Sequence, residues 1–127
     1  GDYSSSSQLH LSTRMAGTIK YEELKALLAQ SGGLVLIDVR GDDEVRGGRI
    51  PGSIHIPLSM LDNALSLSPA EFKARYNATK PAPDTPKLVF YCMSGRRGEM
   101  AAHRAHRDGY INVYNYAGAY REWSRRE

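Results

Sequence analysis

Hydrophobic residues along this chain form short continuous runs that alternate with segments of helical spacing. Residues 34–39 and 88–91 are apolar at nearly every position, which is typical of strands covered on both faces and therefore of parallel sheets. A helix is predicted over residues 21–30, where leucines recur at helical spacing, and Thr18 is its expected N-cap. The first half of the chain thus predicts a helix followed by a buried strand.

The rest of the chain continues this alternation. Ser68 and Glu71 form a capping-box pattern that predicts a helix over residues 69–76, with proline in its first turn. Further helices are predicted over residues 99–107 and 119–126, strands over 54–56 and 111–114, and a short helix or turn over 42–49. We expect an α/β fold: a single domain over residues 18–127, with a mainly parallel sheet of four to five strands and helices on both faces. Residues 1–17, which begin with a serine-rich stretch, are expected to be disordered.

Composition excludes several classes of function. The net charge of +3 is spread along 127 residues, so the electrostatic footprint of a nucleic-acid-binding protein is missing. No apolar run approaches the roughly 18 residues that span a bilayer, so we expect no membrane partner. A single cysteine cannot form an internal disulfide and suits a reducing compartment, so we expect the protein in the cytoplasm, with mitochondria as the alternative location. We also expect a monomer.

The only cysteine, Cys92, stands where the apolar run 88–91 gives way to a loop rich in glycine and arginine. Such a junction suits sulfur chemistry, because backbone N–H groups in a tight loop and the start of the next helix stabilise a thiolate and an anionic substrate. A buried cysteine acting as a small hydrophobe is the plainer interpretation. The polar residues that follow it favour a catalytic cysteine. Its expected substrate-binding loop consists of Met93, Ser94, Gly95, Arg96, Arg97 and Gly98.

Three segments resemble the single-domain rhodaneses, a family of thiosulfate sulfurtransferases. The first segment is Asp38-Val39-Arg40 with the later run Gly48-Arg49-Ile50-Pro51-Gly52-Ser53, the second is the strand with Cys92 and its loop, and the third is the stretch Tyr116-Ala117-Gly118 leading to Trp123. The pattern is most similar to the small animal sulfurtransferases that use glutathione as sulfur acceptor. The resemblance implies a rhodanese domain in which Cys92 takes the outer sulfur of thiosulfate, or of a related persulfide donor, and holds it as a persulfide. It then passes the sulfur to a thiol such as glutathione, or to cyanide.

The remaining chemical candidates are weaker. Asp38 and Arg40 at a strand end are interpreted as an ion pair that braces a loop rather than as catalytic groups. His103 and His106 share one helix face, but no cluster of acidic or cysteine ligands accompanies them, so we expect no metal. No cofactor is expected either, and the predicted partners are a small-molecule sulfur donor and a thiol acceptor.

Two other functions compete with sulfur transfer. Phosphatases of the rhodanese fold have a longer loop with arginine at the sixth position after the cysteine, and this chain has Gly98 there. The shorter loop suits the sulfane sulfur of a donor better than a phosphoryl group. A non-enzymatic interaction or regulatory module is the other alternative, and the presence of Cys92 in an intact loop argues against it.

Overall fold

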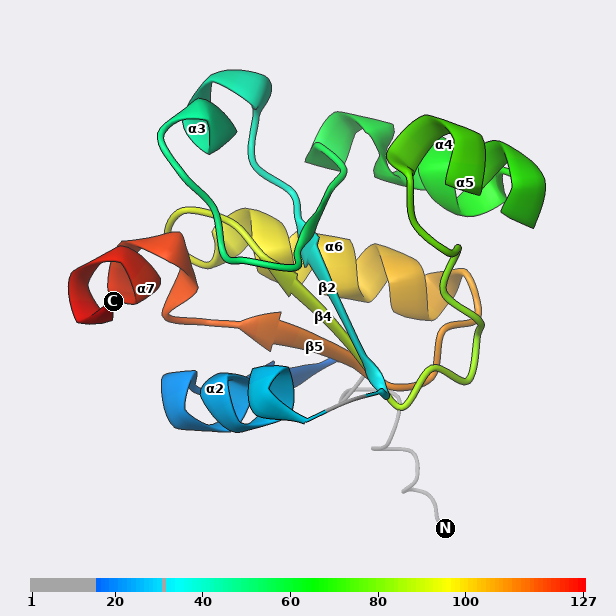
Figure 1. The fold of residues 1–127 in the computed structure, drawn as a ribbon. Helices are drawn as coiled ribbons and strands as arrows, with labels where there is room; N and C mark the ends of the chain where they lie inside the picture. The colour runs from blue at the N-terminus through cyan, green and yellow to red at the C-terminus, as the bar shows by residue number, and fades with distance from the viewer. Residues whose placement is uncertain (1–15, 31) are drawn as a thin grey trace, which may run out of the picture.

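The computed structural model describes residues 16–30 and 32–127. A five-stranded sheet in the order β1-β5-β4-β2-β3 forms its centre, and every neighbouring pair is parallel (Figure 1). The strands are β1 (Gly17–Ile19), β2 (Leu34–Asp38), β3 (Ile54–His55), β4 (Lys87–Tyr91) and β5 (Val113–Tyr116). The predicted mainly parallel sheet within an α/β domain is confirmed.

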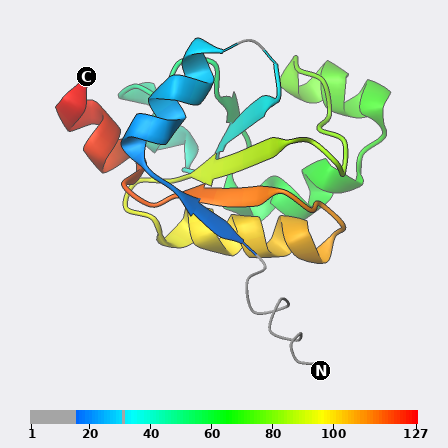
Figure 2. The same ribbon diagram turned by 90° about the horizontal axis from the view of Figure 1, so that it is seen from below.

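Helices cover both faces of this sheet, as Figure 2 shows from below. One face carries α2 (Tyr21–Ala29) and α7 (Ala119–Arg126), and the other carries α4 (Leu61–Ser66), α5 (Pro69–Tyr76) and α6 (Arg96–Arg107). A short helix, α3 (Asp42–Arg46), follows β2 and buries none of its residues. Because β2 and β4 run parallel, the segments that follow them emerge at the same edge of the sheet.

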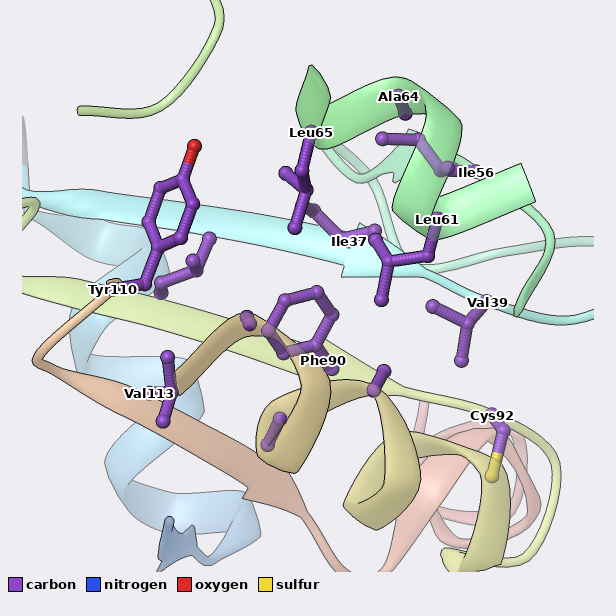
Figure 3. Packing of buried hydrophobic residues seen from close by; sticks show 14 of the residues in the cluster. Ile37, Val39, Ile56, Leu61, Ala64, Leu65, Phe90, Cys92, Tyr110 and Val113 are labelled. Carbon is purple, nitrogen blue, oxygen red and sulfur yellow. The ribbon is translucent and has the colours of Figure 1, made fainter. Parts of the chain in front are cut away.

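Each face has its own apolar core. Leu24, Val89 and Trp123 belong to the core under α2 and α7. The larger core, on the side of α4, α5 and α6, includes Phe72 and Phe90. Figure 3 shows Phe90 over α6. The two buried strands at the centre, β2 and β4, thus supply side chains to both layers, which explains their nearly continuous apolar sequence.

The N-terminal part of the fold corrects one prediction. Thr18 is not a helix cap, because it lies inside β1 and pairs with Asn115 of β5; the residue before α2 is Lys20. Disorder was expected for residues 1–17, and residues 1–15 of that segment lie outside the described residues. Its last two residues are described: Ala16 packs against the larger core and Gly17 begins β1.

Several other boundaries also differ. Helix α6 begins at Arg96 rather than at residue 99, and β5 covers Val113–Tyr116 rather than residues 111–114. Ile111 looks like a strand residue in the sequence, but its side chain is 63% exposed in the connection before β5. The 3₁₀ turn at Leu58–Met60 and the helix α4 were not predicted at all. The helices predicted at residues 69–76 and 119–126 are confirmed, and Ser68 and Glu71 form the expected capping box.

Within the described residues, no helix is both long enough and apolar enough to cross a membrane.

Candidate active site

Cys92 follows the last residue of β4, and its thiol is held by the loop that comes next. The sulfur accepts hydrogen bonds from the backbone N–H groups of Gly95 and Gly98, at 3.1 and 3.3 Å. Cys92 is also only 1% exposed and belongs to the larger apolar core. Figure 3 shows it at one end of this core, beyond Val39, with its sulfur directed toward the start of α6. The sequence left a buried cysteine and a catalytic cysteine as alternative interpretations. In the structure, the thiol is both buried and hydrogen-bonded by the loop.

The two glycines are required by the tight packing of the loop. Gly95 has φ 109°, a conformation that L side chains rarely adopt, and a Cβ there would lie 2.9 Å from the carbonyl oxygen of Ala117. A Cβ on Gly98 would collide with the side-chain oxygen of Asn115 and would lie 3.2 Å from the Cα of Tyr91. A phosphatase-type arginine therefore has no room at position 98.

Helix α7 closes the cysteine loop from the other side. The N–H of Tyr120 donates to the carbonyl of Cys92 at 2.9 Å, and the N–H of Arg121 donates to the carbonyl of Met93 at 3.0 Å. These N–H groups belong to the first turn of α7, which has no partner within its own helix for them. The start of α7 thus supplies donors to the loop, while the loop directs its own N–H groups at the sulfur.

Asn115, on β5, supplies a further contact that the sequence analysis missed. Its side-chain N–H donates to the carbonyl of Gly95 at 3.1 Å, and the residue is 8% exposed. Since the N–H and the carbonyl of Gly95 belong to one residue of left-handed conformation, this contact helps to orient the N–H that reaches Cys92.

Arg97 does not stand free beside the loop. Its guanidinium donates two hydrogen bonds to the Glu44 carboxylate, Nη1 to Oε1 at 2.7 Å and Nη2 to Oε2 at 2.8 Å. Bidentate pairing of this kind is the strongest geometry for arginine and carboxylate. The hydrogen bonds from Arg97 lower the pKa of Glu44 to about 2. Glu44 also accepts from the N–H of Gly41 at the start of α3, so this pair connects α3 to α6.

Asp38 and Arg40 form an ion pair in which both side chains are completely buried. The distances are 3.0 Å from Nε to Oδ1 and 2.8 Å from Nη2 to Oδ2. Arg40 also donates to the carbonyl of Gly48 at 2.7 Å, and its guanidinium lies 4.2 Å from the centre of the Tyr120 ring. The pair thus connects the segment after β2 with residues 48 and 120.

Tyr91 brings this ion pair close to the cysteine. It immediately precedes Cys92, and its hydroxyl donates to Asp38 at 2.7 Å and accepts from the N–H of Ile50 at 3.0 Å. Burial, together with the nearby Asp38 carboxylate, raises the pKa of Tyr91. The Asp38–Arg40 pair therefore contacts residues on both sides of the cysteine loop without touching the sulfur.

The other residues expected in the site have less specific positions. Met93 is half-buried, and Ser94 and Arg96 are exposed at the start of α6. Of the six residues expected to form the substrate-binding loop, Gly95 and Gly98 are the two whose N–H groups donate to the sulfur. Across residues 16–30 and 32–127, no three His, Cys, Asp or Glu side chains gather in a group that could hold a metal ion.

A profile of the rhodanese-like domain matches residues 20–126, so the chain belongs to the rhodanese-like domain family. The resemblance that the sequence motifs indicated is confirmed. In sequence, this chain is similar to the human thiosulfate:glutathione sulfurtransferase, with 48% identity over 115 residues that cover 89% of this chain and 99% of that protein. A thiosulfate:glutathione sulfurtransferase of Saccharomyces cerevisiae is 36% identical over 105 residues, which cover 81% of this chain and 74% of that one. In structure it is similar to the human single-domain sulfurtransferase TSTD1, with a TM-score of 0.84 and 47% identity over 88% of this chain and 98% of that chain.

Proposed function

We propose that this protein is a thiosulfate sulfurtransferase in which Cys92 carries the transferred sulfur. The observation that carries the proposal is the pair of N–H groups, from Gly95 and Gly98, that point at the Cys92 sulfur at 3.1 and 3.3 Å. Both donors favour negative charge on sulfur, as does the start of α6. The same donors suit the persulfide anion that follows and the oxyanion of the leaving group.

The first half-reaction transfers one sulfur atom to the protein. The Cys92 thiolate attacks the outer sulfur of thiosulfate, a new S–S bond forms, the bond to the sulfonate sulfur breaks, and sulfite leaves with the electron pair. The second half-reaction returns the cysteine to its thiolate form when an acceptor takes the outer sulfur. The names of the human and yeast relatives support glutathione as the acceptor, and cyanide is an alternative acceptor.

The surrounding residues act on the loop or on the anionic donor. The buried Asp38–Arg40 pair braces the loop, since it contacts Tyr91 and Tyr120 on either side of Cys92. Arg96 and Arg97 provide positive charge at the start of α6 for the donor, together with the backbone of Met93, Ser94, Gly95 and Gly98. The reaction needs no cofactor, and the protein acts as a monomer.

The cytoplasm is the proposed location, with mitochondria as the alternative. Two relatives support the alternative, because a putative thiosulfate sulfurtransferase of Schizosaccharomyces pombe and the sulfurtransferase RDL2 of Saccharomyces cerevisiae are both named as mitochondrial. The single cysteine is compatible with either compartment.

Mass spectrometry of the intact protein tests the proposal. After incubation with thiosulfate and removal of the excess, the chain gains the mass of one sulfur atom, and a reducing thiol removes it. Cys92→Ser stays unchanged under the same conditions. Sulfur bound at another position, or normal turnover by the serine variant, contradicts the mechanism.

A further inference from the structure

A groove runs alongside the cysteine loop, and no residue of it except Arg97 has a place in the reaction described above. It has a volume of about 370 Å³, within the range of small-molecule sites. Its lining residues are Val39, Gly41, Pro57, Leu58, Ser59, Arg97 and Arg104.

The groove lies next to Cys92. Asp38 and Tyr91 are partners in the β2–β4 pairing, so the following residues, Val39 and Cys92, are neighbours at the ends of adjacent strands. The N–H of Val39 donates to the carbonyl of Tyr91 at 2.9 Å, which continues the pairing to this point. A molecule in the groove therefore lies beside the residue that holds the sulfur.

The chemistry of the groove is asymmetric. Val39, Pro57 and Leu58 form an apolar wall, whereas Arg97 and Arg104 lie on one face of α6, seven residues and about two turns apart. No carboxylate is among the described residues that line it. The groove thus combines an apolar surface with positive charge, which fits a ligand that is partly aliphatic and negatively charged.

The two arginines differ in their availability. Glu44 holds Arg97 through two hydrogen bonds. Arg104 is half-buried, and over residues 16–30 and 32–127 no carboxylate lies within ion-pairing distance of it. Arg104 is therefore the cation that can pair with a ligand without first giving up a partner.

We propose that this groove binds the sulfur acceptor as an anionic peptide thiol of the glutathione type, with Arg104 pairing to one of its carboxylates. The inference rests on the proposed sulfurtransferase function and extends it from the reacting sulfur to the acceptor site. Thiosulfate is too small to need the apolar wall. Its reaction takes place at the Cys92 sulfur, to which the N–H groups of Gly95 and Gly98 already point. A peptide thiol has both the aliphatic portion and the remote carboxylate that the groove can contact.

In this geometry the acceptor thiolate reaches the persulfide from the groove. It attacks the outer sulfur of Cys92–S–SH, an S–S bond forms between the acceptor and that sulfur, and the bond to the Cys92 sulfur breaks. The electron pair stays on Cys92 as a thiolate, which the N–H groups of Gly95 and Gly98 stabilise, and the acceptor leaves as its persulfide.

Discharge of the preloaded protein by matched acceptors tests the proposal. Persulfide prepared with thiosulfate is reacted with glutathione, with glutathione monoethyl ester and with the neutral thiol 2-mercaptoethanol. In Arg104→Gln, we expect the KM for glutathione to rise at least about fivefold, because a charge-assisted contact is lost. Loading by thiosulfate and discharge by 2-mercaptoethanol keep their wild-type rates. If the esterified carboxylate is the contacted one, the ester shows a smaller change.

Arg107→Gln is the matched control. Arg107 is on the same helix, exposed and paired with Asp62 outside the groove, so its loss leaves the KM for glutathione unchanged. An equal change for glutathione and 2-mercaptoethanol in Arg104→Gln, or no change for either, overturns the acceptor site.

A binding measurement separates this inference from the proposed function. S-methylglutathione cannot accept sulfur, so its titration into Cys92→Ser by NMR reports the groove alone. We expect shifts at Val39, Leu58 and Arg104, and weaker binding to the Cys92→Ser, Arg104→Gln protein. Binding elsewhere, or equal affinity for both proteins, refutes the groove even if thiosulfate loads Cys92 normally. If S-methylglutathione binds in the groove but thiosulfate does not load the wild-type protein, the acceptor site is supported and thiosulfate is refuted as the donor.

Discussion

Arg97 and Glu44 are joined by two parallel hydrogen bonds of 2.7 and 2.8 Å, although 53 residues separate them in the chain. Arg97 lies in the first turn of α6 and Glu44 lies in α3, so the pair ties the segment after β2 to the segment after β4. The positive charge of Arg97 is therefore shared with a carboxylate, and its strength at the cysteine loop depends on that carboxylate.

Glu44→Gln gives a pH-dependent change in stability. The pKa of Glu44 is lowered from 4.5 to about 2 in the folded chain, so its ion pair contributes fully above pH 4.5 and is lost as pH falls toward 2. We expect wild type to be more stable than the variant near pH 7 and the difference to vanish near pH 2. Urea unfolding at several pH values measures it. A difference that is constant over this range contradicts the role of the ion pair.

Arg97→Gln should slow the loading of Cys92 by thiosulfate. Loss of a charged contact to the donor lowers the loading rate roughly tenfold. This is the lower end of the effect expected for a contact with a charged group, because Arg97 is partly exposed to solvent. Stopped-flow or quenched mass spectrometry gives the loading rate. Arg125→Gln, at an exposed position of α7, is the control and keeps the wild-type rate. Equal rates in all three proteins assign Arg97 to a purely structural role.

Gly95→Ala should abolish sulfur loading or reduce it at least about tenfold, since a Cβ at φ 109° both strains the backbone and meets the carbonyl of Ala117. Gly109→Ala is a close control. Gly109 has φ 104° and no atom within 4 Å of a Cβ, so that variant has the backbone strain without the contact near Cys92. We expect both variants to lose thermal stability and only Gly95→Ala to lose loading. Similar loading by both variants contradicts the requirement at Gly95.

Arg40→Met removes one partner of the buried ion pair and leaves Asp38 charged in an apolar setting. Breaking such a pair costs about 3–5 kcal/mol of unfolding free energy. Chemical denaturation measures the loss. Because both side chains are fully buried, a loss below about 1 kcal/mol would mean that Asp38 and Arg40 do not brace the fold.

Aryl phosphates should not be hydrolysed at Cys92. Position 98 has no room for the arginine that a phosphatase loop places there, because a Cβ already meets Asn115 and Tyr91. The measurement is release of nitrophenol from p-nitrophenyl phosphate by wild type and by Cys92→Ser. Hydrolysis that disappears in the serine variant overturns the sulfurtransferase assignment.

The sequence predicted those parts of the molecule whose signals are local. The buried strands β2 and β4 are continuous apolar runs, and the cysteine loop follows one of them with its glycines in place. The strand β1 was missed because it has only three residues and is stabilised by pairing with β5, nearly a hundred residues later. A short element with a distant partner leaves no periodic pattern to detect.

The same limit applies to the site. Cys92 and Gly95 could be found from neighbouring residues, but Glu44, Asn115 and Tyr120 reach the loop only through the fold. Glu44 is a typical solvent-facing acid in the sequence, and nothing near it indicates Arg97. Nothing in the sequence near Arg104 indicates a site either, because the groove that it lines with Pro57 and Leu58 exists only in the folded chain.

The donors that α7 gives to the carbonyls of Cys92 and Met93 have a consequence for the order in which the protein is made. A ribosome synthesises Cys92 well before Tyr120 and Arg121, so the nascent chain carries its thiol before the helix that closes the loop exists. Until those two residues are in place, the cysteine loop lacks the hydrogen bonds that they donate to its carbonyl groups. The cysteine loop is therefore completed only by the last helix of the chain to be synthesised.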